Sequence, residues 1–217
     1  MSFHDARLDV LDHARRMWQA GLVVASAGNV SRRIGDDGRL IAITPASIPY
    51  ETMSVEDIAI VELASGRAVD STRLPSSELP MHLGVYRARA DVQAIVHTHA
   101  PYVTTLSVLH KPLPPVIDEM LLYFGGTIEV TDYAFTGTEE VGANVVRALG
   151  DRTGVILANH GNVCIGRDLD EALHVAITME STARVYVQAL QLGEPVPLPE
   201  SALAAGRRRF DARYKPS

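Results

Sequence analysis

The stretch Val92-Gln93-Ala94-Ile95-Val96-His97-Thr98-His99-Ala100 decides how the rest of the chain is organised. Its first half, up to Val96, is rich in β-branched residues and nearly free of polar groups, which predicts a short buried strand. Because side chains alternate across a strand, His97 and His99 point to the same side, with Cα atoms roughly 6.6 Å apart. Two imidazoles at that spacing can converge on one metal ion.

Length and composition predict one soluble globular domain that spans residues 1–217. The chain has 217 residues, of which 47% are hydrophobic and 21% charged. The net charge is -6, and the one basic cluster, Arg207 to Arg209, is expected on the solvated face of a last helix, so no nucleic-acid partner is expected. No stretch approaches about 18 consecutive apolar residues, so no membrane partner is expected either.

Cysteine and lysine are both scarce. The single Cys164 excludes an internal disulfide and, with no secretory signal at the N-terminus, predicts a cytoplasmic protein. Lysine occurs only at Lys111, in a predicted loop, and at Lys215, in the tail. Neither position offers the buried, activated amine that Schiff-base catalysis requires.

Apolar periodicity and turn residues predict an alternation of helices and strands along the whole chain. A hairpin turn is expected at Gly35-Asp36-Asp37-Gly38. Helices are expected over 5–20, 76–89, 101–109, 118–124, 138–150, 168–192 and 200–214, and strands after 29 and over 40–44, 58–63, 92–96, 128–131, 155–160 and 163–165. The fold class is therefore α/β in an α+β-like arrangement, a single domain with a central, largely antiparallel sheet flanked by helices.

A third histidine, His160, ends a second predicted buried strand, and Gly161 is expected to let the backbone turn sharply behind it. Three histidines with one open position are typical of catalytic zinc. Glu78, in the first turn of a predicted helix, offers a carboxylate that can act as an exchangeable ligand or a base. The preceding Ser76 and Ser77 lie at a helix N-terminus, which is a natural anion site.

Five stretches, in order, resemble the class II aldolase/adducin family, and its L-fuculose-phosphate aldolase branch most closely. They are Ala27-Gly28-Asn29-Val30-Ser31, Thr44-Pro45 with Ile48-Pro49-Tyr50-Glu51, Leu74-Pro75-Ser76-Ser77-Glu78, Val96-His97-Thr98-His99 and Asn159-His160-Gly161. The resemblance implies the class II aldolase fold and one Zn²⁺ per chain, bound by Glu78, His97, His99 and His160. It also implies that Asn29, Ser76 and Ser77 bind a phosphate.

The mechanism that the resemblance implies joins these residues. Zinc polarises the carbonyl of a hydroxyketone, Glu78 leaves the metal to take a C–H proton, and the enediolate is held by zinc. In the cleavage direction the same residues split a sugar phosphate into a ketose phosphate and an aldehyde. The resemblance also implies a homotetramer in which a neighbouring subunit completes each active site.

Two positions depart from the aldolase pattern. Where the aldolases carry Thr-Gly after the Thr-Pro pair, this chain has Ala46-Ser47; Ser47 can still donate a hydrogen bond to the substrate, but the missing glycine can crowd a phosphate. Glu119 aligns with a catalytic tyrosine that the neighbouring subunit contributes. The acid that protonates the aldehyde oxygen is therefore Glu119, Tyr123 or the C-terminal Tyr214.

The leading functional prediction is a zinc-dependent aldolase, a lyase acting on a small ketose phosphate such as L-fuculose 1-phosphate. The alternatives within the fold are a ribulose-phosphate 4-epimerase and a metal-dependent decarboxylase of a keto acid or aromatic acid. A non-catalytic, adducin-like assembly module is less favoured, because all four metal ligands are present. The apolar segment 116–124, which contains Glu119, is expected to lie at the subunit interface.

Overall fold

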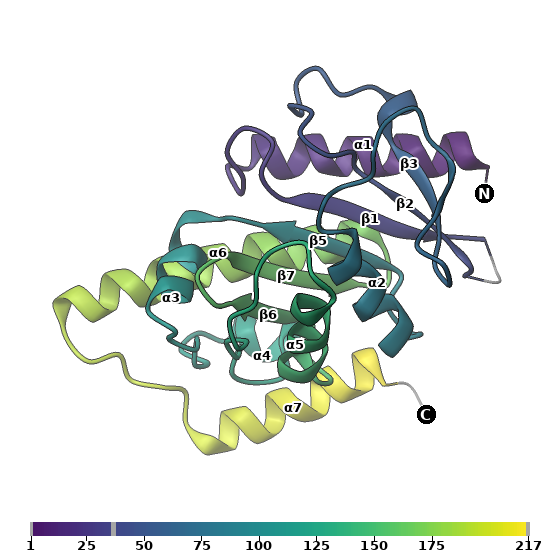
Figure 1. Ribbon diagram of the computed structural model, residues 1–217. Coiled ribbons are helices and arrows are strands. Elements are labelled where there is room, and N and C mark those ends of the chain that lie inside the picture. Colours follow the sequence, from purple (N-terminus) through teal and green to yellow (C-terminus); the bar gives the residue numbers. More distant parts are fainter. Residues whose placement is uncertain (1, 36–37, 216–217) are drawn as a thin grey trace.

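The computed structural model describes residues 2–35 and 38–215. Within them, seven strands form one sheet, in the order β4-β3-β2-β1-β5-β7-β6, and every neighbouring pair is antiparallel (Figure 1). The strands are β1 Asn29–Ile34, β2 Leu40–Ile43, β3 Ala59–Glu62, β4 Ala68–Asp70, β5 Ala94–Thr98, β6 Gly154–Leu157 and β7 Gly161–Gly166. The helices are α1 Phe3–Gln19, α2 Leu79–Ala88, α3 Pro101–Val108, α4 Glu119–Tyr123, α5 Glu139–Leu149, α6 Leu169–Leu192 and α7 Glu200–Tyr214, with a 3-10 turn, η1, at Val55–Asp57. The predicted fold class is confirmed.

Helices cover both faces of the sheet, and β5 lies between β1 and β7 at its centre. Ala94 and Val96 of β5 belong to the hydrophobic core beneath α1 and α6, whereas Ile95 belongs to the second core, beneath α2 and α5. His97 continues the alternation and shares the face of Ile95. The strand thus delivers His97 to the side of the sheet on which α2 begins.

The strand that carries His97 begins and ends two residues later than expected. The first predicted residue, Val92, closes a turn through its N–H bond to the Arg89 oxygen instead of joining the sheet. His97 itself lies within the sheet, opposite Asn29 of β1 and Val163 of β7, and is fully buried. A polar side chain can occupy such a position only because its ring nitrogens have partners, as described below.

Other differences from the expected elements follow from local hydrogen bonding. Residues 128–131 make isolated bridges rather than a strand: Ile128 with Leu113, and Val130 with Ile156. The short edge strand β4 was not expected. The serines expected to open the helix at 76 lie in a preceding turn, and the helix begins at Leu79 with Pro80 in its first turn. The hairpin turn at 35–38 lies partly outside the described residues.

Two carboxylates of α6 bind the neighbouring helices α3 and α7 to α6. Glu180 accepts the first main-chain N–H groups of α3, from Tyr102 (3.0 Å) and Val103 (2.9 Å), so it caps the helix that follows His99. Glu171 accepts from Arg213 (2.9 Å) and Tyr214 (3.2 Å) at the end of α7. Among the described helices, none is both long and apolar enough to cross a bilayer.

Candidate metal centre and active site

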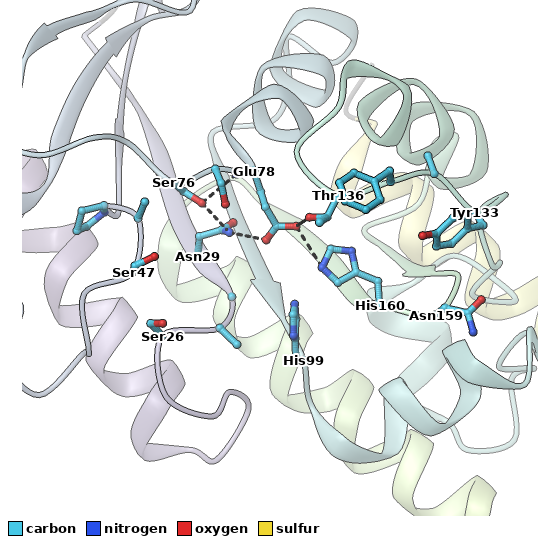
Figure 2. Close-up of a pocket in the computed structure, with 17 residues that line it drawn as sticks. Ser26, Asn29, Ser47, Ser76, Glu78, His99, Tyr133, Thr136, Asn159 and His160 are labelled. Atoms are coloured by element: carbon cyan, nitrogen blue, oxygen red, sulfur yellow. Dashed lines mark hydrogen bonds and ion pairs between the residues drawn. The ribbon is translucent and has the colours of Figure 1, made fainter.

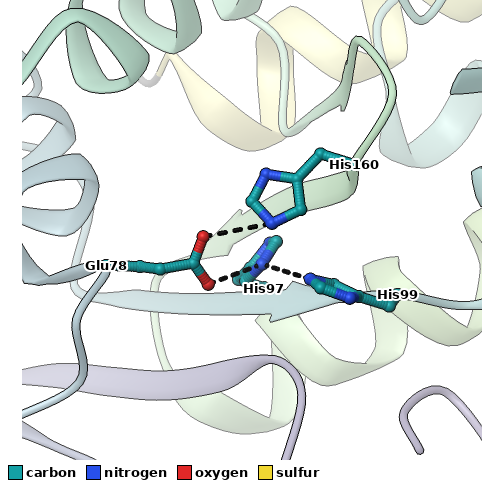
Figure 3. A group of neighbouring side chains, drawn as sticks. All are labelled: Glu78, His97, His99 and His160. Carbon is teal, nitrogen blue, oxygen red and sulfur yellow. Dashed lines mark hydrogen bonds and ion pairs between the residues drawn. The ribbon is translucent and has the colours of Figure 1, made fainter. Parts of the chain in front are cut away.

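Four side chains from three separate segments meet at one point beside the end of β5 (Figure 3). His97 and His99 come from β5 and the residue after it, with their Nε2 atoms 3.0 Å apart. The Glu78 carboxylate reaches Nε2 of His97 at 2.9 Å and Nε2 of His160 at 3.1 Å. All four candidate ligand atoms lie within 4.8 Å of one another. The structure therefore brings together the four residues that the sequence predicted as metal ligands.

The tautomer of His97 shows that this cluster fits a cation. Nδ1 of His97 lies 2.9 Å from the main-chain oxygen of Asn162, which can only accept, so Nδ1 carries the hydrogen and Nε2 of the neutral ring presents a lone pair to the cluster. That lone pair faces the Glu78 carboxylate and the Nε2 atom of His99. His97 Nε2 and the Glu78 carboxylate, 2.9 Å apart, are both acceptors in this tautomer, so a proton or a metal ion must lie between them. Three imidazole nitrogens and one carboxylate oxygen are ligands that zinc accepts and magnesium does not favour.

The pKa shifts within the metal-free cluster keep Glu78 ionised and His99 neutral. Burial lowers the pKa of His97, but the charge and hydrogen bond of Glu78 outweigh it and raise that pKa, so a metal ion would displace a proton from His97. Burial raises the pKa of the Glu78 carboxyl, but the charges and hydrogen bonds of His97 and His160 outweigh it and hold that pKa far below its usual range. Burial, followed by the charges of His97 and His160, lowers the pKa of His99 to about 3. At neutral pH Glu78 is therefore ionised and His99 is neutral.

A cavity of about 390 Å³ opens in front of these ligands (Figure 2). Hydroxyl and amide groups line one side of it, from Ser26, Asn29, Ser47, Ser76 and Ser77. The Asn29 amide donates both to Ser76 Oγ (3.0 Å) and to Glu78 Oε2 (2.9 Å). The hydrogen-bonding groups proposed from sequence for a phosphate thus lie beside the metal cluster, and Asn29 links the two.

Known proteins match the chain over most of its length. The model for the class II aldolase and adducin N-terminal domain matches residues 9–187. The chain belongs to the class II aldolase and adducin family. It is 33% identical over 211 residues to the 5-deoxy-D-ribulose 1-phosphate aldolase of Bacillus thuringiensis serovar kurstaki, covering 97% of this chain and 98% of that protein. It is 35% identical over 189 residues to the L-fuculose phosphate aldolase of Escherichia coli O6:H1, covering 87% and 86%.

A solved structure of an L-fuculose 1-phosphate aldolase is similar throughout, with a TM-score of 0.90 at 33% identity, covering 95% of this chain and 96% of that one. The predicted relationship to the class II aldolases, as an enzyme and not an assembly module, is confirmed by these matches. The predicted extent of a single domain over residues 1–217 stays a prediction.

The loops that carry the aldolase motifs owe their shapes to close backbone packing. Gly161 was expected to supply the sharp turn after His160, and that expectation is wrong: the residue with a left-handed backbone is Asn159, at φ 55°, and His160 lies in the turn between β6 and β7 rather than at a strand end. Gly161 is needed for space, because a Cβ there would collide with the main-chain oxygen of Thr98 and press on the His99 ring.

Tyr50 is buried, and its hydroxyl donates to the oxygens of Ala27 (2.8 Å) and Gly28 (2.9 Å), which fixes the loop before Asn29.

The departure from the aldolase Thr-Gly pair keeps the backbone shape that glycine favours. Ser47 has φ 59°, in the left-handed region that glycine adopts without strain. Its side chain lies at the cavity wall (Figure 2). The serine thus adopts a backbone conformation that suits glycine and adds a hydroxyl to the cavity wall.

The three candidate proton donors lie away from this cavity within one chain. Glu119 is exposed at the start of α4, and Tyr123 ends the same helix, with its ring against His174. Tyr214 ends α7, where it contacts Glu171, and burial raises its pKa to about 12. None of the three lines the cavity of its own chain. Their participation from a neighbouring subunit stays a prediction.

One loop of the site was not expected from the sequence. Tyr133, Phe135 and Thr136 line the cavity opposite the serines, and the Thr136 hydroxyl donates to Glu78 Oε1 at 3.0 Å. Both aromatic rings are exposed. The loop 132–137 carries no metal-ligating or glycine-rich motif, and only its exposed aromatics could have drawn attention to it.

Proposed function

We propose that the protein is a zinc-dependent aldolase that cleaves a small ketose 1-phosphate into a hydroxyketone phosphate and an aldehyde. The observation that carries this proposal is the meeting of Glu78, His97, His99 and His160 beside a cavity lined by Asn29, Ser76 and Ser77. A metal-ligand set next to a group of hydrogen-bond donors suits a substrate with a carbonyl at one position and a phosphate nearby.

The names of the relatives support the substrate class. One relative acts on 5-deoxy-D-ribulose 1-phosphate and another on L-fuculose phosphate. In a ketose 1-phosphate with its carbonyl at C2, a retro-aldol reaction breaks the C3–C4 bond and leaves dihydroxyacetone phosphate. The part of the sugar beyond C3 leaves as the aldehyde. We take L-fuculose 1-phosphate and 5-deoxyribulose 1-phosphate as the two substrates to test.

One Zn²⁺ per chain is proposed, held by Glu78, His97, His99 and His160. When bound, it supplies a Lewis acid for the ketose carbonyl. Ser47, Ser76 and Ser77 hold the phosphate, and Asn29 orients Ser76 and Glu78, which places C3 of the substrate near Glu78. As the C3–C4 bond breaks, its electron pair stays with the hydroxyketone fragment, and the ionised Glu78 passes a proton from solvent water to C3. The proton of the C4 hydroxyl leaves to solvent through a second group, so the protons balance.

A second group must accept the proton of the C4 hydroxyl during cleavage. We propose that a neighbouring subunit of a homotetramer supplies it through Glu119, Tyr123 or Tyr214. Exposed apolar side chains support an assembly, among them Leu122 of α4 and Ile177 and Val185 of α6. A cytoplasmic location is proposed as well; the free, buried thiol of Cys164 supports it.

Glu78→Gln tests the proposed role of the carboxylate. Gln has nearly the same shape but cannot take a proton, so exchange of solvent deuterium into C3 of dihydroxyacetone phosphate should slow by about 10²–10⁴-fold. Proton NMR of the ketose phosphate measures this step directly in the zinc-loaded protein. Glu194→Gln, at an exposed loop position, is the matched control and should exchange at the unmutated rate.

A wild-type protein that binds dihydroxyacetone phosphate but exchanges no proton would refute the aldolase proposal. Exchange in Glu78→Gln at the unmutated rate would remove Glu78 from the role of base. Metal analysis of the same samples checks the ion, because stoichiometric zinc is expected per chain.

A further inference from the structure

A buried row of polar side chains runs from the interior of the protein to the active site. Asn29 and Ser31 are two residues apart on β1, so they share one face, and His82 and Tyr86 are one helical turn apart on α2. All four are at most 2% exposed. Polar groups this deeply buried need hydrogen-bond partners, and these four find them in one another.

The direction of each hydrogen bond follows from the end that touches Glu78. The Glu78 carboxylate can only accept, so the Asn29 group beside it is the amide nitrogen, and Asn29 Oδ1 faces His82 Nε2 as an acceptor. Nε2 of His82 therefore carries a hydrogen. The His82 ring is fully buried, and its nitrogens contact only the neutral side chains of Asn29 and Ser31, so the ring is neutral and Nδ1 is an acceptor.

The remaining bonds of the row are then determined. Ser31 Oγ, 2.6 Å from His82 Nδ1, donates its single hydrogen to that nitrogen. Tyr86, whose hydroxyl is 2.9 Å from Ser31 Oγ, must donate to the serine. Every bond from Tyr86 through Ser31 and His82 to Asn29 thus points the same way.

The row ends on a hydroxyl hydrogen that the protein does not use. Ser76 Oγ accepts from the Asn29 amide (3.0 Å) and from the main-chain N–H of Glu78 (3.2 Å). Within residues 2–35 and 38–215, Ser76 Oγ only accepts hydrogen bonds and donates its own hydrogen to no group, and Ser76 lines the cavity. An anion in the cavity is the acceptor that would complete this arrangement.

We propose that His82 is a positioning residue: with Ser31 and Tyr86 it fixes the Asn29 amide, so that Asn29 holds Glu78 and leaves the Ser76 hydroxyl to donate to the phosphate of the substrate. This inference rests on the proposed function for the identity of the anion. If the amide turned over, its oxygen would face the Glu78 carboxylate, and Ser76 would lose one of its two donors.

The tautomer of His82 can be measured without a substrate. In the zinc-loaded protein labelled with ¹⁵N-histidine, His82 should show the shifts of a neutral ring protonated at Nε2, with its signals assigned by their loss in His82→Gln. A ring protonated at Nδ1, or at both nitrogens, at neutral pH would overturn the proposal. This result is independent of whether the protein is an aldolase.

Two substitutions at His82 separate the hydrogen bond from packing. His82→Leu fills the site but donates nothing, and the dissociation constant for dihydroxyacetone phosphate should rise about tenfold, the loss expected for one hydrogen bond of about 1.4 kcal/mol. His82→Gln keeps an N–H that can reach Asn29 and should recover most of the affinity. Thr182→Val is the control, since it removes a buried hydroxyl that has no partner among the described residues and lies outside the site.

Calorimetric titration of each zinc-loaded variant gives these constants. Equal losses in His82→Leu and His82→Gln, or no loss in either, would overturn the proposal, as would a loss in Thr182→Val as large as that in His82→Leu. If the wild-type protein bound no dihydroxyacetone phosphate, the proposed function would fail instead, and the tautomer measurement would still decide the role of His82.

Discussion

Ser47 shows how one residue carries a conformational cost in the wall of the active site. Its backbone is left-handed at φ 59°, and such a conformation costs a residue other than glycine roughly 1–2 kcal/mol. Ser47→Gly removes that cost. It also lowers the free energy of the unfolded state by about 0.4–1 kcal/mol, because glycine gives the unfolded chain more conformational freedom. We expect Ser47→Gly to raise the free energy of unfolding by up to about 1.5 kcal/mol, measured by urea denaturation.

Ser47→Val is the opposing variant, because a β-branched residue at positive φ is strained. It should lower the free energy of unfolding by about 1–2 kcal/mol relative to Ser47→Gly. The side chain is exposed, so little packing changes in either variant. Equal stabilities for the glycine and valine variants would mean that the loop relaxes out of the left-handed region.

At the residue scale, the sequence predicted those site residues whose positions follow from a periodic element. Strand alternation placed His97 and His99 together, and the start of a helix placed Glu78 near them. The positive φ of Asn159 and Ser47 was not predictable, since it arises from the loops that these residues close. Nor was Thr136, whose contact with Glu78 joins parts of the chain far apart in sequence.

At the scale of single elements, α7 depends on one carboxylate of α6. Glu171 accepts hydrogen bonds from Arg167 as well as from Arg213 and Tyr214. Burial raises the pKa of Glu171, but the bonds from Arg167 and Arg213 outweigh it and lower the pKa to about 2, from an ordinary value of 4.5. The ionised carboxylate therefore favours the folded state.

Because the folded state lowers this pKa, the stability that Glu171 contributes decreases as the pH falls. The contribution of Glu171 is complete above about pH 4.5 and is lost as the pH falls towards about 2. Glu171→Gln should lower the free energy of unfolding by roughly 1.5–3 kcal/mol at pH 7, as expected for hydrogen bonds to a charged group. Thermal unfolding in the presence of a chelator, at pH 7, 4.5 and 3, measures the difference without the metal.

The difference in the free energy of unfolding between the wild type and Glu171→Gln should become smaller as the pH falls. A gap that stayed constant between pH 7 and pH 3 would mean that Glu171 contributes by packing and not by charge. Asp170→Asn is a useful comparison, because Asp170 is an exposed neighbour on α6 that pairs with Arg16 of α1 and not with α7.

Helices whose ends are marked by capping residues, glycine or proline were predicted well, whereas elements that depend on tertiary contacts were not. The last helix has the predicted bounds, 200–214, and α3 and α5 differ from prediction by one residue at each affected end. Residues 128–131 have the composition of a strand, but they form only two isolated bridges, to Leu113 and to Ile156. The edge strand β4 is entirely exposed, so its sequence carries no apolar alternation to detect.

At the scale of the whole molecule, the proposed contribution of a neighbouring subunit to the active site leads to a test by subunit mixing. Glu119→Ala and His97→Ala should each be inactive alone, because one lacks the proposed acid and the other a metal ligand. Reassembled from an equal mixture, about one quarter of the sites in a closed ring would combine an intact His97 with an intact Glu119 from the neighbour. Activity should recover to about that fraction.

Sedimentation of the wild-type protein supplies the control for mixing. A monomer at the assay concentration would refute the shared site. No recovery in a confirmed oligomer would leave the assembly intact and pass the role of the proton donor to Tyr123 or Tyr214, which the same mixing design tests.

The separation of the metal ligands along the chain also sets the order of events during synthesis. Glu78, the histidine pair and His160 come from three segments, and His160 joins the others only when β7 pairs with β5. A growing chain therefore lacks the fourth ligand until residue 160 has left the ribosome and the sheet has closed. If the proposed site binds zinc, its capture would follow folding, and the rate of zinc uptake by refolding chains would report the rate of sheet closure.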